Sequence, residues 1–480
     1  MTVSSTAGVL LVPLLVSAAV CPCVTAGAIH GRGVRWTTLA EARPIVAALG
    51  DSAPPALRGA ARSGDDARWL EWLEARDADI RRRIATGDED SVINLMLYGT
   101  GFTRQPRATG AVAASAPNGR VDGVMDGRLA DLVEAIEAPG ADERLRFARQ
   151  VVERHGIAVG PSSREATRRY LLEVRSRVMA ENDRYMRRLA EVPRSDPAQA
   201  RAMNATLYHD RGLSSDTSVR VDFALDQALS AVRGMGEPAQ RRLDRVGIVG
   251  PGLDFVDKAQ GSDLYPVQMI QPFALADSLR RLDISRHPVL TTLDISPRVM
   301  AHLRDARRHA TTRQPYRLSV AIEQDIAHSR PDPAMVEYWR RFGDRIGTPM
   351  TNDLRTASAS PVRARSVDVR PEVVRDITGV ELNIVLERLA DSHPSRQFDL
   401  IVATNVLIYY DTAEQALAAG NIAGMLRPGG LLMTNQPVPA VAACGLSPLL
   451  IMSVAFDRVP SAAGSHERGD SIFVYRKGSS

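Results

Sequence analysis

The stretch FDLIVATNVLIYYD, residues 398–411, decides the fold of the second half of this chain. Its apolar run, Leu400 to Ala403, ends at the polar pair Thr404-Asn405. Such a run predicts a buried parallel strand whose carboxyl end opens onto a ligand crevice. Further on, LRPGGLLMTN, residues 426–435, predicts a helix end, a tight turn and another apolar strand. Together the two segments predict one βαβ unit.

The composition is that of a globular protein with full cores. The chain has 480 residues, 44% of them hydrophobic, and a net charge of +4, so two domains are the default expectation. Nearly all basic residues are arginines that alternate with acids along helical segments, which indicates solvated helix faces. No zinc-knuckle spacing, long basic run or aromatic–basic alternation predicts a nucleic-acid partner.

The N-terminus carries a segment that predicts export. Residues 9–24 are apolar but too short, and too interrupted by two prolines, for a stable transmembrane span. Small-residue cleavage patterns follow, so we expect residues 1–28 to be a signal peptide and the protein to lie in the periplasm or cell envelope. The alternative, a mis-assigned start or apolar tail on a cytoplasmic protein, is motivated by the absence of Lys or Arg before Arg32.

Residues 29–240 predict an all-α helical domain. Apolar side chains recur at helical spacing, for example at Leu129, Leu132, Val133 and Ile136. No group of side chains in this half forms a recognisable catalytic or binding motif. We expect a helical bundle that packs against or covers the second domain, and the alternative is a module that recognises a substrate or partner.

Residues 241–480 predict a Rossmann-like α/β domain. The apolar runs place strands at 246–249, 289–293, 382–386, 398–403, 431–434, 451–456 and 471–475, the last two as an antiparallel hairpin. Gly250-Pro251-Gly252 after the first strand is a tight turn that lets a ligand approach the backbone. Asp294, after the second strand, is placed to accept ribose hydroxyls, and the alternative is that it merely caps the helix beginning at Ser296-Pro297.

The order of these features resembles that of the class I S-adenosylmethionine-dependent methyltransferases, over roughly residues 245–477. That family has a glycine turn, acids after strands two and three, and a Pro-Gly-Gly turn before strand five. The resemblance implies a doubly wound, mostly parallel, seven-stranded sheet with a C-terminal antiparallel hairpin, and S-adenosylmethionine as cofactor. Residues 398–411 are locally similar to the chemotaxis-receptor methyltransferases, although Thr404 stands where that family has Arg.

The resemblance also implies roles for single residues. Gly250 and Gly252 would line the methionine part of the cofactor, and Asp294 would bind the ribose hydroxyls. Glu387, eleven residues before the fourth strand, would lie near the adenine amine, with Asp325 as a second candidate for that role.

At the reacting end, Thr404 and Asn405 would border the cofactor and the transferred methyl group. Asn405 and Tyr409 are weak candidates for catalysis. The chain departs from the family at two places: Ile248 stands where an acid is usual, and Asp254 replaces the third glycine. Asp254 would bind the amino end of the cofactor or point away from it.

Insertions near residues 255–275 and 310–380 lengthen the domain and are expected to form lids, substrate walls or oligomer contacts. Tyr265, in the first of them, is a candidate to close over the cofactor. The acceptor, a small molecule or a protein, is not indicated by any residue type, because the cofactor is already activated. The oligomeric state is equally open.

The sequence therefore leaves two classes of function open. The first is a methyltransferase acting on an unidentified acceptor. The alternative is an exported, non-catalytic protein that keeps the methyltransferase fold as a binding or interaction module, because S-adenosylmethionine is a cytosolic cofactor. A nicotinamide dehydrogenase is disfavoured by Phe255 at the third glycine position. The sequence has no motif of a metal site, a P-loop or a nucleophile elbow.

Overall fold

The computed structural model describes residues 29–30, 33–108, 118–191, 208, 211–215, 220–236, 242–256, 265–321, 330–354, 362–390, 393–461 and 464–479. The predicted signal peptide, residues 1–28, lies outside the described residues, and so does Asp325. No helix in the described ranges combines the length and the apolar character needed to cross a membrane.

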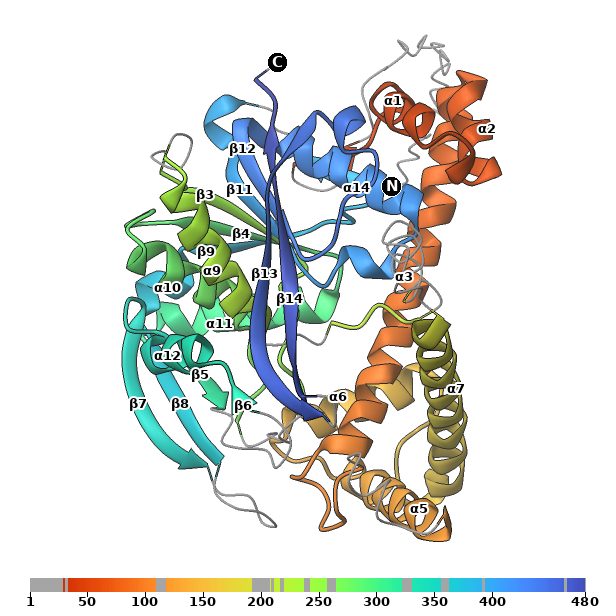
Figure 1. The fold of residues 1–480 in the computed structure, drawn as a ribbon. Helices are drawn as coiled ribbons and strands as arrows, with labels where there is room; N and C mark the ends of the chain where they lie inside the picture. The colour runs from red at the N-terminus through yellow and green to blue at the C-terminus, as the bar shows by residue number, and fades with distance from the viewer. Residues whose placement is uncertain are drawn as a thin grey trace, which may run out of the picture.

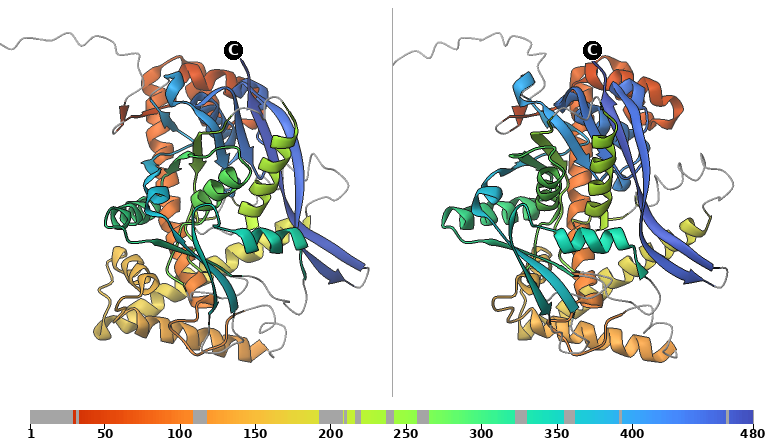
Figure 2. Two further views of the ribbon diagram at one scale, coloured as in Figure 1. Left: turned by 90° about the vertical axis from the view of Figure 1, so that its left-hand side faces the viewer. Right: turned by 60° about the vertical axis from the view of Figure 1, so that its left-hand side comes forward.

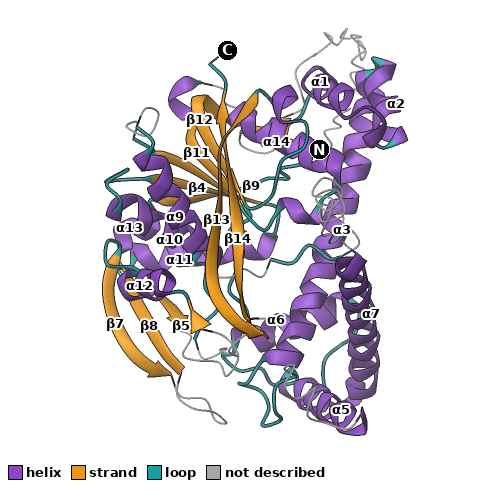
Figure 3. Ribbon diagram, viewed as in Figure 1, coloured by secondary structure: helices purple, strands orange, loops and turns teal. Residues whose placement is uncertain are grey.

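An eight-stranded sheet forms the centre of the second half (Figures 1 and 3). Its strand order is β6-β13-β14-β12-β11-β3-β4-β9. Five central strands are parallel: β3 (Arg245–Val249), β4 (Val289–Asp294), β9 (Ile377–Glu381), β11 (Phe398–Ala403) and β12 (Leu426–Thr434). The predicted mostly parallel sheet is thereby confirmed.

The closing hairpin is also confirmed, and it is longer than the sequence indicates. β13 (Leu446–Ser461) and β14 (Gly464–Lys477) pair antiparallel, and β14 lies between β13 and β12. The two-residue strand β6 (Arg330–Pro331) adds an eighth member at the edge. The polar residues 464–470, which follow no apolar pattern, also lie in a hairpin strand, because pairing continues past the apolar run.

The third predicted strand is in the wrong place. The structure puts it at β9, whereas the predicted run 382–386 is irregular backbone. That run is apolar because Leu382, Ile384, Val385 and Leu386 are buried between neighbouring elements. β9 lies at the sheet edge and is largely exposed, so its sequence lacks the apolar signal of a central strand.

Both faces of the sheet are covered, which explains the continuous apolar strands. Leu400 and Val402 of β11 point into one core, whereas Ile401 and Ala403 point into the other. The first core is shared with α9 (Arg220–Gly234), α10 (Gln271–Arg281) and α11 (Pro297–Thr311). The second is shared with α14 (Thr412–Met425) and with helices of the first half.

The first half is helical, as predicted, and its helices run along the α/β domain (Figure 2). Its remaining helices are α1 (Leu39–Leu49), α2 (Pro55–Ser63), α3 (Asp66–Tyr98), α5 (Asn118–Ala135), α6 (Glu143–Arg154) and α7 (Arg164–Glu191). α3, with 33 residues, contributes to both cores: Trp69 and Leu73 pack in one, and Val92 and Met96 in the other. The predicted domain boundary near residue 240 falls between α9 and β3 and stays a prediction.

The insertion at 310–380 forms a small layer of its own. A three-stranded antiparallel sheet contains β5 (Tyr316–Ala321), β8 (Val362–Val369) and β7 (Gly347–Leu354) in that order. The helices α12 (Pro333–Arg341) and α13 (Pro371–Arg375) accompany it.

Buried hydrogen bonds made by Thr37 and Asn421 join the N-terminal segment to the irregular run 382–386. There, β2 (Val34–Trp36) pairs with β1 (Ile29–His30) and with β10 (Glu387–Leu389). Asn421 of α14 donates from Nδ2 to the carbonyls of Ile384 (3.1 Å) and Val385 (3.0 Å). The Thr37 hydroxyl lies 2.7 Å from Asn421 Oδ1 and 2.9 Å from the Leu386 carbonyl. One side chain thus takes the place of sheet pairing for this run.

Replacing Asn421 by Leu should lower the free energy of unfolding by about 3 kcal/mol, because buried carbonyls and a hydroxyl lose their partners. Denaturant unfolding measures this change. The matched control is Gln150→Leu on the exposed side of α6, expected to stay within about 0.5 kcal/mol. Equal effects of the two variants would contradict the role given to Asn421.

Candidate functional site

A cavity lies where the carboxyl ends of β3, β4 and β11 meet. In a parallel sheet these ends share one edge, and the chain order reverses between β3 and β11. The residues that line the cavity come from both halves of the chain: Ile84, Leu213, Ser214, Ser215, Val249, Gly250, Gly252, Leu293, Asp294, Ile295, Ser296, Leu382, Ile384, Thr404, Asn405, Val406, Tyr409 and Tyr410. Six of the predicted site residues therefore border one cavity, namely Gly250, Gly252, Asp294, Thr404, Asn405 and Tyr409.

The glycine turn requires glycine for two reasons. Gly250 and Gly252 have φ angles of 61° and 63°, in the left-handed region that other residues rarely adopt. A Cβ on Gly250 would collide with the Val406 side chain. The backbone N–H of Gly250 donates to the Leu293 carbonyl (2.9 Å), which fixes the turn against β4.

Asp294 is buried at the end of β4, beside this turn. Its Oδ1 accepts from the backbone N–H of Ser296 (2.7 Å), and its carboxyl also accepts from the N–H of Gly252. Burial raises the pKa of Asp294 to about 7, with a smaller contribution from Glu381. The carboxyl is thus held rigidly at the cavity, and its role toward a ribose stays a prediction.

Ser296 is the residue before α11, but its side chain makes no capping hydrogen bond. Its backbone N–H donates to Asp294 Oδ1. The Ser296 Oγ is buried and has no partner in the described part of the chain. A second such hydroxyl in the cavity wall is that of Ser215. Buried polar atoms without partners indicate a polar ligand or water.

Asn405 is fixed by a reciprocal amide pair. Its φ angle is 58°, and its backbone N–H donates to Asn435 Oδ1 (2.9 Å). Asn435 Nδ2 donates to Asn405 Oδ1 (2.6 Å) and to Asp470 (2.9 Å) on β14. The sequence analysis missed Asn435, although its position directly after an apolar strand was a usable signal, the same one that singled out Asn405.

Asp254 and Tyr265 do not line the cavity. The Tyr265 hydroxyl donates to Asp254 Oδ2 (2.8 Å), and Gln268 Nε2 donates to the same oxygen (3.0 Å). All three side chains are buried. Of the alternatives left open for Asp254, the structure favours the one in which it points away from the cavity, and Tyr265 holds Asp254 instead of closing over a cofactor.

Glu387 is not among the residues that line the cavity. It begins β10, is buried, and accepts from the backbone N–H of Asn383 (2.8 Å). The acid that ends the observed third strand is Glu381, which is exposed and lies 3.1 Å from Arg81. The role of Glu387 near the adenine amine stays a prediction.

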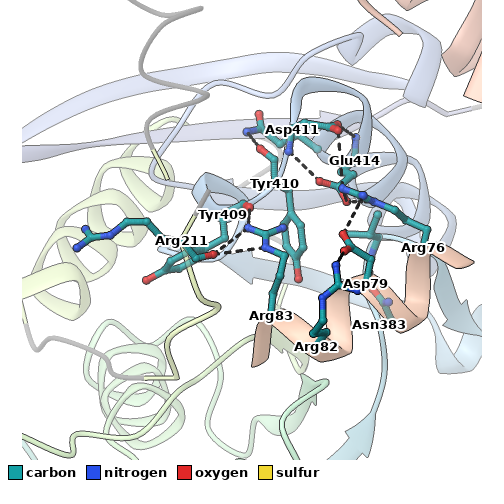
Figure 4. A network of polar contacts seen from close by, with 12 residues as sticks. Arg76, Asp79, Arg82, Arg83, Arg211, Asn383, Tyr409, Tyr410, Asp411 and Glu414 are labelled. Atoms are coloured by element: carbon teal, nitrogen blue, oxygen red, sulfur yellow. Dashed lines mark hydrogen bonds and ion pairs between the residues drawn. The ribbon is translucent and has the colours of Figure 1, made fainter. Parts of the chain in front are cut away.

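Tyr409 and Tyr410, which follow β11, line the cavity, and Figure 4 shows them beside Arg83. Tyr410 is buried, whereas Tyr409 packs edge-on against Tyr208, 5.7 Å between ring centroids. Arg83 of α3 donates to the Tyr409 carbonyl. Asp411 caps α14 by a reciprocal capping box with Glu414, the structural role favoured over a catalytic one.

A strap from the first half, residues 211–215, forms one wall. The N–H of Leu213 donates to the Arg83 carbonyl (2.9 Å), and the N–H of Leu253 donates to the Ser215 carbonyl (2.7 Å). Gly87 allows the close approach, because a Cβ there would overlap the Leu213 carbonyl. The helical half therefore supplies part of the site, which no local sequence signal indicated.

In the described ranges, no three or more His, Cys, Asp or Glu side chains are grouped so that they could hold a metal ion. The site is built instead from backbone turns, hydroxyls, amides and one carboxyl.

Comparison with known proteins identifies the class of this domain. Residues 345–436, about a fifth of the chain, match the family model described as CheR methyltransferase, SAM binding domain. This match contains the stretch 398–411 and confirms the local similarity found there. With the strand order, it places the second half of the chain in the class I S-adenosylmethionine-dependent methyltransferase superfamily. S-adenosylmethionine, the cofactor that the resemblance implied, is the one this family model names.

Similar solved structures are distant. One is magnesium protoporphyrin IX methyltransferase from Synechocystis PCC 6803 with bound SAM, 10% identical, with 61% of this chain and 90% of that chain covered and a TM-score of 0.26. Another is the N-methyltransferase NodS from Bradyrhizobium japonicum WM9, 14% identical, covering 58% and 98%, with a TM-score of 0.24. No curated protein matches the sequence. Similarity at this level says nothing of the acceptor.

Asp294→Asn should stabilise the ligand-free protein increasingly as the pH rises from about 4 to about 7. The unfolded state releases this proton near the ordinary pKa of 3.8, whereas the folded state keeps it until about 7, so the wild type loses stability across this window. Melting temperatures of both proteins at pH 5 and 7.5 measure the effect. Asp305→Asn, at an exposed position of α11, should show no such divergence, and parallel pH curves for the Asp294 variant would refute the argument.

Proposed function

We propose that this protein is an S-adenosylmethionine-dependent methyltransferase acting on an unidentified acceptor. The observation that carries the proposal is the convergence of the Gly250–Gly252 turn, the buried Asp294 and the Thr404-Asn405 pair on one cavity. These groups lie at the carboxyl ends of three neighbouring parallel strands, where ligands bind in such sheets.

The residues present fit a polar, nucleoside-containing ligand. The hydroxyls of Ser215 and Ser296 are buried in the wall without partners in the described chain, so a ligand with several hydroxyl and amine groups would satisfy them. The apolar wall residues Leu293, Ile384 and Val406 offer contact to the flat faces of such a ligand. The cavity thus combines apolar walls with a few fixed polar groups, as ligand sites usually do.

The bound cofactor would supply an activated methyl group on a sulfonium, which leaves alignment as the main task of the protein. The residues available for alignment are rigid. Asn405 is fixed by Asn435, and Gly250 is fixed by β4. Tyr409, which lines the cavity and contacts Tyr208, is the candidate to meet the acceptor.

Two departures from the family pattern support the alternative that the protein is not catalytic. Ile248, where the family has an acid, is fully buried in the core, and Asp254 is occupied by Tyr265 and Gln268. The residues around the glycine turn, from Ile248 to Asp254, therefore offer fewer contacts to a cofactor than the family pattern does. Export, if residues 1–28 act as a signal peptide, would separate the protein from a cytosolic cofactor.

Isothermal titration calorimetry with S-adenosylhomocysteine tests the proposal on the full chain. We expect a dissociation constant in the micromolar range, weakened at least about tenfold, or ~1.4 kcal/mol, by Asp294→Ala. Asp305→Ala on the exposed face of α11 is the control and should bind like the wild type. A folded wild-type protein that does not bind would refute the proposal.

Activity separates the two alternatives. Labelled S-adenosylmethionine incubated with the purified protein and fractionated small molecules or proteins should transfer its methyl group to at least one fraction. Binding without any transfer would favour the non-catalytic alternative. N-terminal sequencing of the mature protein from separated cell fractions then shows whether residues 1–28 are removed and in which compartment the protein lies.

A further inference from the structure

The hydrogen of the Thr404 hydroxyl is available to a hydrogen-bond acceptor in the cavity. Thr404 is buried and borders the cavity at the end of β11. Its Oγ1 accepts a hydrogen bond from Gln271 Nε2 (2.9 Å). A hydroxyl has a single hydrogen, and no described residue accepts the one on Thr404. With its oxygen occupied from behind, the hydroxyl can satisfy its hydrogen only toward the cavity.

Gln271 lies behind Thr404 in a position without solvent. It is the first residue of α10, is 2% exposed, and does not itself line the cavity. The Asp222 carboxyl lies close enough to this amide for the amide to lower the pKa of Asp222, whereas Gln271 Oε1 has no hydrogen-bond partner in the described part of the protein. Because a carboxyl oxygen attracts the nitrogen end of an amide, Asp222 favours the orientation in which Nε2 donates to Thr404.

Asp222 supports the amide from the first half of the chain. It lies on α9, is 4% exposed, and has one oxygen, Oδ1, that no described group contacts. Burial raises the pKa of Asp222 to about 8, with Asp254 adding to the rise. A neutral carboxyl of this kind still accepts the amide hydrogen. Two other polar groups, the Tyr338 hydroxyl and the Asp254 carboxyl, lie near enough to interact electrostatically with Asp222.

We propose that Gln271, supported by Asp222, is a positioning residue that presents the Thr404 hydroxyl as a hydrogen-bond donor to an oxygen or nitrogen of the ligand in the cavity. The inference rests on the proposed function, because it takes the ligand to be S-adenosylmethionine or its product. It adds a specificity element behind the cavity wall, built from α9 and α10, which pack together in the same core.

A double-mutant cycle on the full chain tests the inference, with affinity for S-adenosylhomocysteine as the readout. Thr404→Val should weaken binding about tenfold, and Gln271→Met, which keeps the shape but removes the donor, about fivefold. Because Gln271 acts through Thr404, adding Q271M to T404V should change affinity by less than about twofold. Asp222→Leu should reproduce the Q271M effect, whereas Asp222→Asn, which still accepts the amide hydrogen, should bind like the wild type.

Gln268→Met is the matched control. Gln268 is an equally buried glutamine three residues away, whose contacts reach Asp254 and Ser319 and not the cavity. We expect a lower melting temperature with unchanged affinity. An unchanged affinity in Q271M, or the same loss in the presence and absence of T404V, would overturn the inference while the proposed function stands. A folded wild-type protein that does not bind would overturn both.

Discussion

The parallel pairing of β3 with β4 and of β3 with β11 is the constraint on which the rest of the structure depends. Parallel strands end at the same edge of a sheet, and the chain leaves β3 toward one side and later returns on the other. The residues just past these ends must therefore share a small space. Glycine satisfies this at Gly250, because any side chain there would overlap Val406.

The helical half is tied to this edge through α3. That helix contributes to both hydrophobic cores and carries Gly87, against which the strap 211–215 packs. Arg76 of the same helix lies 2.6 Å from Glu414 at the start of α14 (Figure 4). A single long helix thus positions a wall of the cavity relative to the sheet, so binding at the cavity and packing of the first half are physically coupled.

The buried carboxyls of Asp294 and Asp222 lower the stability of the folded protein at the pH where they ionise. Burial raises the pKa of Asp294 and of Asp222 well above the ordinary value, so ionising either one opposes folding. Many other buried polar side chains have close partners, as at Asn421 and Asp254, although single atoms elsewhere, such as the hydroxyls of Thr167 and Tyr338, have none in the described ranges. Unsatisfied atoms at Ser215, Ser296 and Gln271 lie in or directly behind the cavity. Such local conflicts are expected where a ligand completes the structure.

The sequence by itself determined the sheet and its ligand edge, because buried parallel strands are apolar on both faces and end at glycine, acid or amide residues. Gly250, Asp294 and Asn405 could be assigned from that local pattern alone. The tertiary structure decided what local pattern does not encode. The run 382–386 looks like a strand but is irregular backbone bound by Asn421, so the third strand was predicted in the wrong place. Ser215 and Gln271 reach the site only because packing brings segments distant in sequence to one edge.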